Sequence, residues 1–273
     1  MSLDKLSKTL MVDPQKRKTR LSDIRADDTF DFIEKEGSQK ILERNRDRLE
    51  DLQYLLFGQN KHSLLIVLQG MDTSGKDGTI RHVMHGINPR ICDVASFKAP
   101  TEEEASHDFL WRIHKVVPKR GQISIFNRSH YEAVIVERVH KFVPKSVWNM
   151  RYKQINDFER MLSEYDMRIL KFFLHISKDE QKKRLQERLD DPTKNWKMSV
   201  NDLKERELWD EYMEAYEDAL NECSTPCAPW FVIPADKKWF RNIAISQIII
   251  ETLESLDMKY PKPNFDPKDI VVT

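Results

Sequence analysis

The segment Gly70–Gly78 (Gly-Met-Asp-Thr-Ser-Gly-Lys-Asp-Gly) carries residue types that could bind a phosphate group. It holds three of the seven glycines of the chain, and its glycine, glycine and lysine spacing is that of a P-loop. Glycines let successive backbone amides converge on phosphate oxygens, while a lysine bridges the outer phosphates. The alternative is an ordinary tight turn. We predict phosphate binding by Thr73, Ser74, Gly75, Lys76, Asp77 and Gly78.

Two carboxylates depart from the common form of this loop. Asp77 stands where a Ser or Thr usually follows the lysine and binds Mg²⁺. Asp72 lies inside the loop, where bound phosphates would repel it unless a cation lay between them. We therefore expect Asp72 to be a metal ligand or a carboxylate beside the acceptor. Capping of the loop backbone is the alternative.

A second polar segment, Phe126–Glu132 (Phe-Asn-Arg-Ser-His-Tyr-Glu), ends an apolar run. The carboxyl ends of strands meet at the ligand crevice of a doubly wound sheet, so Asn127 and Arg128 should face the loop. An Asp that holds Mg²⁺ usually ends this strand, and Asn127 is a weaker, neutral ligand. The planar fork of Arg128 matches phosphate oxygens and could stabilise a moving phosphoryl group. Glu132 is expected to form a capping box with Ser129 and also to face the crevice.

The elements that position these residues follow from the apolar pattern. Five short runs are typical of buried strands: residues 63–69, 91–97, 122–126, 169–176 and 230–233. Helical patterns alternate with them, which predicts a parallel sheet with helices on both faces. A capping box of Thr101 and Glu104 should open one helix that closes near Pro118, and Ser177 with Glu180 should form another.

The chain is expected to have three parts. Residues 1–60 form a charged, mostly helical N-terminal extension, residues 61–260 the α/β domain, and residues 261–273 an extended tail. Within the domain, residues 178–220 form a helical insertion above the sheet. Arg184 and Arg188 lie one helical turn apart in it and could close over phosphates as a lid; a solvated face is the alternative. The expected core residues near its end are Trp209, Tyr212, Tyr216 and Leu220.

Composition limits the classes of partner. The chain has 45 Lys plus Arg and 45 Asp plus Glu, which disfavours a globally basic nucleic-acid binder but permits a local basic groove. No apolar run approaches the roughly 20 residues of a membrane span, and the N-terminus lacks the apolar block of a secretory signal. Three cysteines without metal-ligand spacing are typical of a reducing cytoplasm. We expect a cytoplasmic protein without membrane or nucleic-acid partners. The basic residues 16–20 are expected to be solvated surface, with a polyanion contact as the alternative.

Over about residues 25–260 the sequence resembles the polyphosphate kinase 2 family. The resemblance rests on Gly70–Gly78 (GMDTSGKDG), Phe126–Glu132 (FNRSHYE), Lys98–Thr101 (KAPT), Arg184–Lys197, the Trp209-Asp210 pair and Ile233–Lys238 (IPADKK). It implies a three-layer α/β/α P-loop kinase fold with a five-stranded parallel sheet and a helical lid, similar to thymidylate kinases. It also implies phosphoryl transfer between inorganic polyphosphate and a nucleotide, with Mg²⁺ or Mn²⁺ as cofactor, by a homo-oligomer.

The resemblance also implies roles for individual residues. Asp72, Lys76 and Arg128 match active-site positions, while Arg184 and Arg188 resemble lid arginines that contact phosphates. The basic side chains expected along the polyphosphate channel are Arg128, Arg138, Arg184 and Arg188. Because breaking one phosphoanhydride while making another is nearly energy-neutral, we expect a reversible reaction.

Two positions depart from many family members, which have Asp in place of Asn127 and Asn in place of Glu132. The FNRSHYE form resembles members that accept both AMP and ADP. We expect Asp72 to be the main metal ligand, with Asn127 a weak one and Glu132 compensating. Lys98 and Arg112 are candidates for the nucleotide side. Substrates are expected among AMP, ADP, ATP and guanine nucleotides; an ATP-dependent nucleotide or small-molecule kinase and a non-catalytic nucleotide-binding switch remain alternatives.

Overall fold

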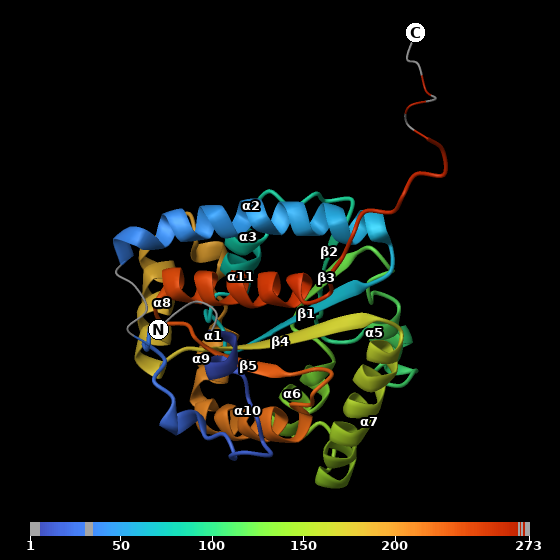
Figure 1. Ribbon diagram of the computed structural model, residues 1–273. Helices are drawn as coiled ribbons and strands as arrows, with labels where there is room; N and C mark the ends of the chain where they lie inside the picture. The colour runs from blue at the N-terminus through green and yellow to red at the C-terminus, as the bar shows by residue number, and fades with distance from the viewer. Residues whose placement is uncertain (1–5, 31–34, 267, 269, 271–273) are drawn as a thin grey trace.

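The computed structural model describes residues 6–30, 35–266, 268 and 270 (Figure 1). Its centre is a parallel five-stranded sheet with the strand order β2-β3-β1-β4-β5. The strands are β1 (Ser63–Gln69), β2 (Cys92–Ser96), β3 (Ile123–Asn127), β4 (Met167–His175) and β5 (Trp230–Pro234). The predicted parallel sheet is therefore confirmed, and each strand begins and ends within two residues of its predicted bounds.

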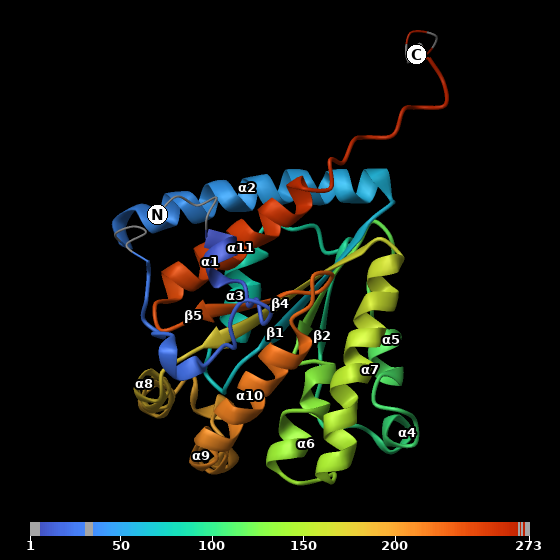
Figure 2. The ribbon, with the colours of Figure 1, turned by 60° about the horizontal axis from the view of Figure 1, so that its bottom comes forward.

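Helices cover both faces of the sheet (Figures 1 and 2). One face carries α2 (Lys35–Gln59), α3 (Lys76–Val83) and α11 (Lys238–Glu254), and the other carries α6 (Val136–Val139), α7 (Lys145–Glu164) and α10 (Trp209–Cys223). Alternate residues of β1 divide between the two layers, because successive strand side chains point to opposite faces. Leu64 and Ile66 join the α2–α11 layer, whereas Leu65 and Val67 join the α7–α10 layer. This is the predicted three-layer α/β/α arrangement.

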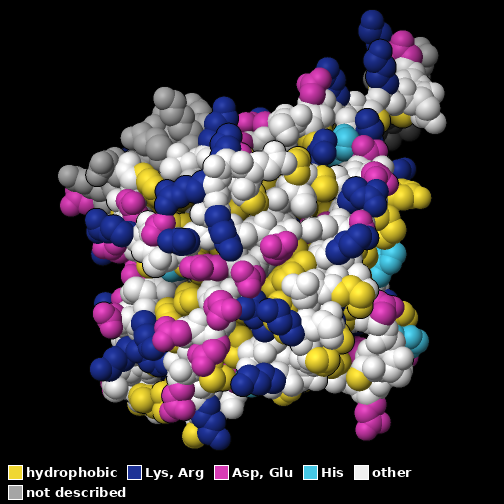
Figure 3. Space-filling model, turned by 90° about the horizontal axis from the view of Figure 1, so that it is seen from below, with side chains coloured by type: hydrophobic (Ala, Val, Ile, Leu, Met, Phe, Trp, Pro, Cys, Tyr) yellow, Lys and Arg dark blue, Asp and Glu magenta, His cyan; other side chains and the backbone are white. Residues whose placement is uncertain are grey.

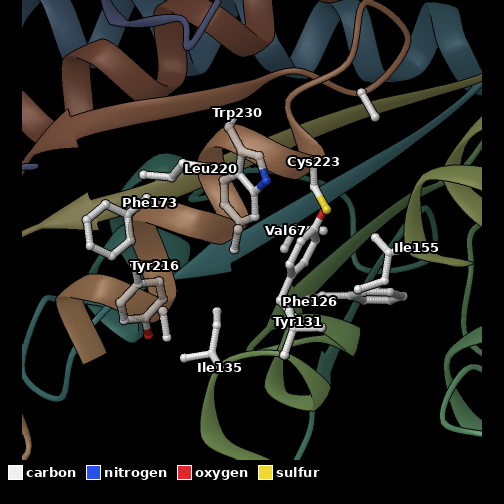
Figure 4. Packing of buried hydrophobic residues seen from close by; sticks show 14 of the residues in the cluster. Val67, Phe126, Tyr131, Ile135, Ile155, Phe173, Tyr216, Leu220, Cys223 and Trp230 are labelled. Carbon is white, nitrogen blue, oxygen red and sulfur yellow. The ribbon is translucent and has the colours of Figure 1, made fainter. Parts of the chain in front are cut away.

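Aromatic side chains fill the layer between the sheet and α7 and α10. Figure 4 shows Phe126 and Trp230 from the sheet, with Tyr131 beside them and Tyr216 on α10. The Tyr131 and Trp230 rings meet edge to face, with centroids 4.8 Å apart. The four residues expected to belong to the core at α10 are all buried: Trp209, Tyr212, Tyr216 and Leu220.

The described part of the N-terminal extension covers the outer edge of β5. After α1 (Leu6–Leu10), the Val12 amide donates to the Trp230 carbonyl at 2.8 Å, and Met11 forms an antiparallel bridge with Phe231. The chain then follows α10 through a short 3₁₀ turn, η2 (Leu21–Asp23), before α2 begins. Within the basic residues 16–20, Lys16 and Arg17 pair with nearby carboxylates, as a solvated surface does.

Two predicted helix starts differ from the structure. Thr101 and Glu104 do form a capping box, but α4 (Glu102–Ala105) ends at once and α5 (Trp111–His114) is separate. The Asp108 carboxylate accepts from the Leu110 amide, and such local side-chain bonds compete with the helix. Ser129 does not form a capping box with Glu132. The turn η3 (His130–Ala133) is 3₁₀, and Ser129 caps the Tyr131 amide instead.

The insertion at the carboxyl end of the sheet consists of α8 (Lys178–Asp190), the 3₁₀ turn η4 (Asn195–Lys197) and α9 (Val200–Glu207) (Figure 2). Ser177 caps α8 by accepting from the Glu180 amide, while the Glu180 carboxylate holds Arg184 and does not return to the cap. We name α8, η4 and α9 together the lid.

The surface shows no large region of one charge on the face in Figure 3, where Lys, Arg, Asp and Glu side chains are intermixed. This agrees with the balance of 45 basic and 45 acidic residues. None of the helices described is both long enough and apolar enough to cross a membrane.

Candidate active site

The phosphate loop joins β1 to α3, as the sequence predicts. Gly75 is the N-cap of α3 with φ 103°, a conformation that favours glycine. A Cβ atom there would also lie 1.8 Å from Arg241 Nη1, so a side chain has no room. Gly70 and Thr73 likewise have positive φ, 148° and 64°. The chain thus reverses tightly and presents the first amides of α3 to one point, as phosphate binding requires.

Lys76, the first residue of α3, bonds back to the start of this loop. Its Nζ donates to the carbonyl oxygens of Gly70 at 2.7 Å and Met71 at 3.2 Å. Burial lowers the pKa of the ammonium, while the charge of Asp72 works in the opposite direction. The positive group is therefore held partly out of water where the outer phosphates of a ligand would bind.

The end of β3 lies directly beside the loop, because β3 pairs with β1 and Asn127 is in register with Leu68. Asn127 Nδ2 donates to Asp77 Oδ1 at 2.6 Å. An amide at the usual position of Asp thus meets a carboxylate at the usual position of Ser or Thr. Together they carry a single negative charge, as the common pair does. The carboxylate lies in the loop, however, and the neutral side chain lies at the end of the strand.

Arg128 and Asp72 face each other across the opening. The Arg128 guanidinium lies 3.3 Å from Asp72 Oδ1 and is about half exposed. Burial would lower the pKa of Arg128, but the charges of Glu132 and Asp72 outweigh it and raise that pKa. Arg128 also has φ 63°, and its amide is fixed by the Leu68 carbonyl. This side chain is charged, near the loop and accessible to a ligand.

Glu132 is held by Gln69, the last residue of β1. Gln69 Nε2 donates to Glu132 at 3.0 Å and to Ser129 Oγ at 3.1 Å. Burial raises the pKa of Glu132, against the opposing charge of Arg128. The bond to Gln69 is the reason that Glu132 takes no part in a capping box.

Gln69, Asp72, Arg128 and Glu132 line one cavity of about 210 Å³ beneath the lid, whereas Lys76, Asp77 and Asn127 lie outside its lining. The lid contributes Asp202 and Glu205, which the sequence analysis did not identify, and α10 contributes Tyr212 and Tyr216. Burial and the charge of Asp72 raise the pKa of Asp202. The charged residues that line the cavity are Asp72, Arg128, Glu132, Asp202 and Glu205. Four carboxylates with one arginine repel an anion unless cations enter with it.

Arg188 does not line this cavity, but its Nη1 atom lies 3.8 Å from Oδ2 of Asp202, which does. Arg184, the other predicted lid arginine, bonds within the protein in this structure, and its contact with phosphate stays a prediction. A guanidinium has five N–H donors, and those of Arg184 bind the Glu180 carboxylate and the carbonyl oxygens of Thr73, Ser74, Ala235 and Asp236. Its local sequence shows the charge but not these acceptors, which come from distant parts of the chain.

Arg138, which was expected along the polyphosphate channel, does not line this cavity. It binds Glu214 and Asp218, both at 2.7 Å, and stacks on Trp148 at 4.4 Å. It lines a separate hollow beside α7 and α10. Two carboxylates neutralise its charge there, and its contact with polyphosphate stays a prediction.

The two candidates for the nucleotide side lie together, because Arg112 Nη1 donates to the Lys98 carbonyl at 2.9 Å. Arg112 also bonds Glu104 at 3.3 Å. Neither residue lines the cavity at the loop, and their contact with a nucleotide stays a prediction.

Arg241 is a further residue that the sequence analysis missed. It is 2% exposed and donates to the Ser74 carbonyl at 3.2 Å. A signal existed, since Arg241 and Asn242, like Ser246 and Gln247, stand among the apolar residues of the segment from Phe240 to Ile250.

Oxygen ligands suited to Mg²⁺ surround the loop. Asp72, Asp77, Asn127 and Glu132 supply the carboxylate and amide oxygens that hard cations prefer. Over the described residues, no group of three or more His, Cys, Asp or Glu side chains is close enough to hold a metal alone. The residues therefore fit an ion that takes its remaining ligands from phosphate and water, as Mg²⁺ commonly does.

The sheet order, the loop after β1, the polar end of β3 and the lid define a P-loop kinase fold, and comparisons with known proteins place it further. The family model described as polyphosphate kinase 2 matches residues 32–261. The crystal structure of polyphosphate kinase 2 from Arthrobacter aurescens TC1 is similar, with a TM-score of 0.93 and 43% identity over 97% of this chain and 94% of that chain. The chain belongs to the polyphosphate kinase 2 family.

Two curated relatives are similar over most of their length. The AMP/ADP-polyphosphate phosphotransferase of Meiothermus ruber is 55% identical over 250 residues, which are 90% of this chain and 92% of the relative. The ADP-polyphosphate phosphotransferase of Rhodopseudomonas palustris is 49% identical over 243 residues, 85% of this chain and 84% of the relative.

Proposed function

We propose that this protein transfers a terminal phosphoryl group between inorganic polyphosphate and AMP or ADP, in a Mg²⁺-dependent and reversible reaction. The observation that carries the proposal is the cavity where the P-loop, Arg128 and the carboxylates Asp72 and Glu132 meet. The names of the two relatives support polyphosphate and adenine nucleotides as substrates.

The reaction needs a nucleotide phosphate oxygen to attack the terminal phosphorus of polyphosphate. A new phosphoanhydride bond forms to the nucleotide, and the bond to the next phosphate of the chain breaks. The polyphosphate leaves one phosphate shorter, with the electron pair of the broken bond on its new terminal oxygen. One phosphoanhydride replaces another, which supports reversibility.

The residues of this site supply positioning and charge, which phosphoryl transfer mainly requires. Loop amides and Lys76 would hold phosphate oxygens, and the guanidinium of Arg128 would offset charge on the moving group. Asp72 would be the main protein ligand of Mg²⁺, with Glu132 assisting. Asn127 would act mainly by holding Asp77. Magnesium, or manganese in its place, would neutralise phosphate charge among these carboxylates.

The test is product formation with polyphosphate as the sole phosphoryl donor. With Mg²⁺, ADP should give ATP and AMP should give ADP, and a chelator should stop both reactions. GDP in place of ADP tests the guanine nucleotides. The proposal fails if no ATP forms while the protein phosphorylates another acceptor from ATP, as an ordinary kinase does. Nucleotide binding without any transfer would instead indicate a non-catalytic switch.

Assembly into a homo-oligomer and a cytoplasmic location stay predictions. Light scattering of the purified protein and fractionation of cells that contain it would test them.

A further inference from the structure

Two buried arginines from distant elements hold the same carbonyl group of the phosphate loop. Arg184 on α8 is 6% exposed and Arg241 on α11 is 2% exposed. Their Nη1 atoms donate to the Ser74 carbonyl at 3.3 and 3.2 Å. Neither arginine lines the cavity beneath the lid. Both arginines contact the carbonyl side of the Ser74–Gly75 peptide, which is opposite its N–H group.

This contact fixes the direction of an amide group. In a planar trans peptide the C=O and N–H bonds point in opposite directions. Since the Ser74 carbonyl points at the two arginines, the Gly75 N–H points away from them. Gly75 is the N-cap of α3, where free amides bind phosphate oxygens. The arginines thus favour the peptide orientation in which the Gly75 N–H is available to an anion.

The charge below the loop is also unbalanced. Arg184 has one carboxylate partner, Glu180, at 2.9 Å. Among the described residues, Arg241 bonds only to neutral acceptors, the Ser74 carbonyl and Asn242 Oδ1. Burial, together with the charge of Arg184, lowers the pKa of Arg241 to about 10. A buried cation without a counter-ion is costly, and an anion in the loop would reduce that cost.

We propose that Arg241, together with Arg184, is a positioning residue that promotes phosphate binding without touching the phosphate. It acts by holding the Ser74–Gly75 peptide and by placing an uncompensated positive charge behind the loop. The proposal rests on the proposed function only in requiring that the loop binds phosphate groups.

The test is the affinity of an Arg241→Met variant for pyrophosphate, measured by calorimetry with Mg²⁺ at constant ionic strength. Methionine keeps the apolar stem and removes the charge and the donors. We expect binding to weaken about tenfold, as loss of one charge at short range in a protein allows. A residue with only a structural role would lower the melting temperature of the ligand-free protein and leave the pyrophosphate affinity unchanged.

Two further variants complete the test. Arg48→Met removes an arginine of α2 that pairs with Glu254 at 2.8 Å and lies outside the cavity, and it should bind pyrophosphate as the unmodified protein does. Arg241→Lys keeps the charge but loses the forked bonds to Asn242, and its affinity should fall only about threefold. This milder variant decides the matter if Arg241→Met does not fold.

The proposal is overturned if Arg241→Met, or Arg241→Lys in its place, binds pyrophosphate as tightly as the unmodified protein, or if Arg48→Met loses as much affinity. Failure of the proposed function would look different. The unmodified protein would then bind pyrophosphate, and lose it on Arg241 substitution, yet form no ATP from polyphosphate.

Discussion

At the scale of single residues, Asp77 and Asn127 form a hydrogen-bonded pair beside the phosphate loop. Each is unusual when compared with a common P-loop and strand end, and the sequence alone suggested a weakened metal site. Because a 2.6 Å bond joins them and keeps one carboxylate beside the loop, we infer that the two changes compensate each other. The sequence also identified Asp72, Lys76 and Arg128, which the structure brings together, because these residues lie within two local motifs. It could not reveal that Gln69 holds Glu132, since that contact depends on strand pairing.

Replacing Asn127 with Asp tests this compensation. A second carboxylate beside Asp77 should destabilise the metal-free protein by about 1–2 kcal/mol, because like charges would then lie within hydrogen-bond distance. Thermal unfolding without Mg²⁺ should show the loss, and added Mg²⁺ should reverse it. The double variant Asp77→Ser/Asn127→Asp should show no such loss. An unchanged melting temperature in the single variant contradicts the argument.

Lys76→Ala should lower the turnover number about a hundredfold to a thousandfold, since it removes a charge aimed at the reacting phosphates. Steady-state rates with ADP and polyphosphate measure it. Arg48→Met, which removes a cation paired with Glu254 away from the loop, is the control and should retain its activity. Near-normal turnover by the alanine variant would refute the role of the loop.

Glu132→Asn should weaken the use of AMP more than that of ADP if Glu132 supports a second metal ion. Its pKa is raised by burial, so its ionised form is lost at a higher pH than that of an ordinary glutamate. As the pH is lowered, the rate with AMP should therefore begin to fall at a higher pH than an ordinary glutamate would give. Glu132→Gln should abolish this loss of rate at acid pH. Equal losses on both nucleotides argue against a second ion.

Among the elements, the strands were predicted closely because buried parallel strands are short continuous apolar runs. The helices between them were harder. One predicted helix from Thr101 to Pro118 is two short helices, since Asp108 forms a local turn. The charge and the helical pattern of residues 178–220 predicted the lid, but they did not predict which groups its arginines contact. Arg184 proved to be an internal brace that joins α8 to the phosphate loop and to the end of β5.

Removing that brace should affect the fold of the whole site. Arg184→Met would leave the carbonyl groups of Thr73, Ala235 and Asp236 without their donor and the Glu180 carboxylate without its close partner, while Ser74 keeps its bond to Arg241; the change should cost about 3–5 kcal/mol of unfolding free energy. Urea denaturation followed by circular dichroism measures it. Arg188→Met, whose contact with Asp202 is long and partly exposed, should cost under about 1 kcal/mol. Similar losses in both variants would show that Arg184 is not a brace.

At the scale of the whole molecule, a buried ionic cluster joins the sheet and α7 to the turn η3. Lys171 on β4 and Glu159 on α7 form an ion pair with no exposed surface. Glu159 also bonds His130 and Tyr131 of η3, the turn between Arg128 and Glu132. Burial alone would raise the pKa of Glu159, but the charges of Lys171 and His130 outweigh it and lower that pKa. No sequence pattern pairs these residues, because they come from three separate elements.

Lys171→Met should therefore cost about 3–5 kcal/mol at neutral pH, where it leaves a buried carboxylate alone. In the unmodified protein the stabilisation is present above the ordinary glutamate pKa of 4.5 and is lost as the pH falls through the lowered pKa of the folded state. Protonation relieves the variant, so the difference between the two proteins should shrink toward low pH. Urea unfolding at pH 7 and pH 4 measures both values, and a constant difference would contradict the assignment.

Lys76 bonds to the Gly70 and Met71 carbonyls with two of its three N–H donors. One side chain thus fixes the backbone of the turn between β1 and α3 and leaves one donor for a further acceptor. Replacement of Lys76 should therefore loosen this turn as well as remove a positive charge, so both effects belong to one residue.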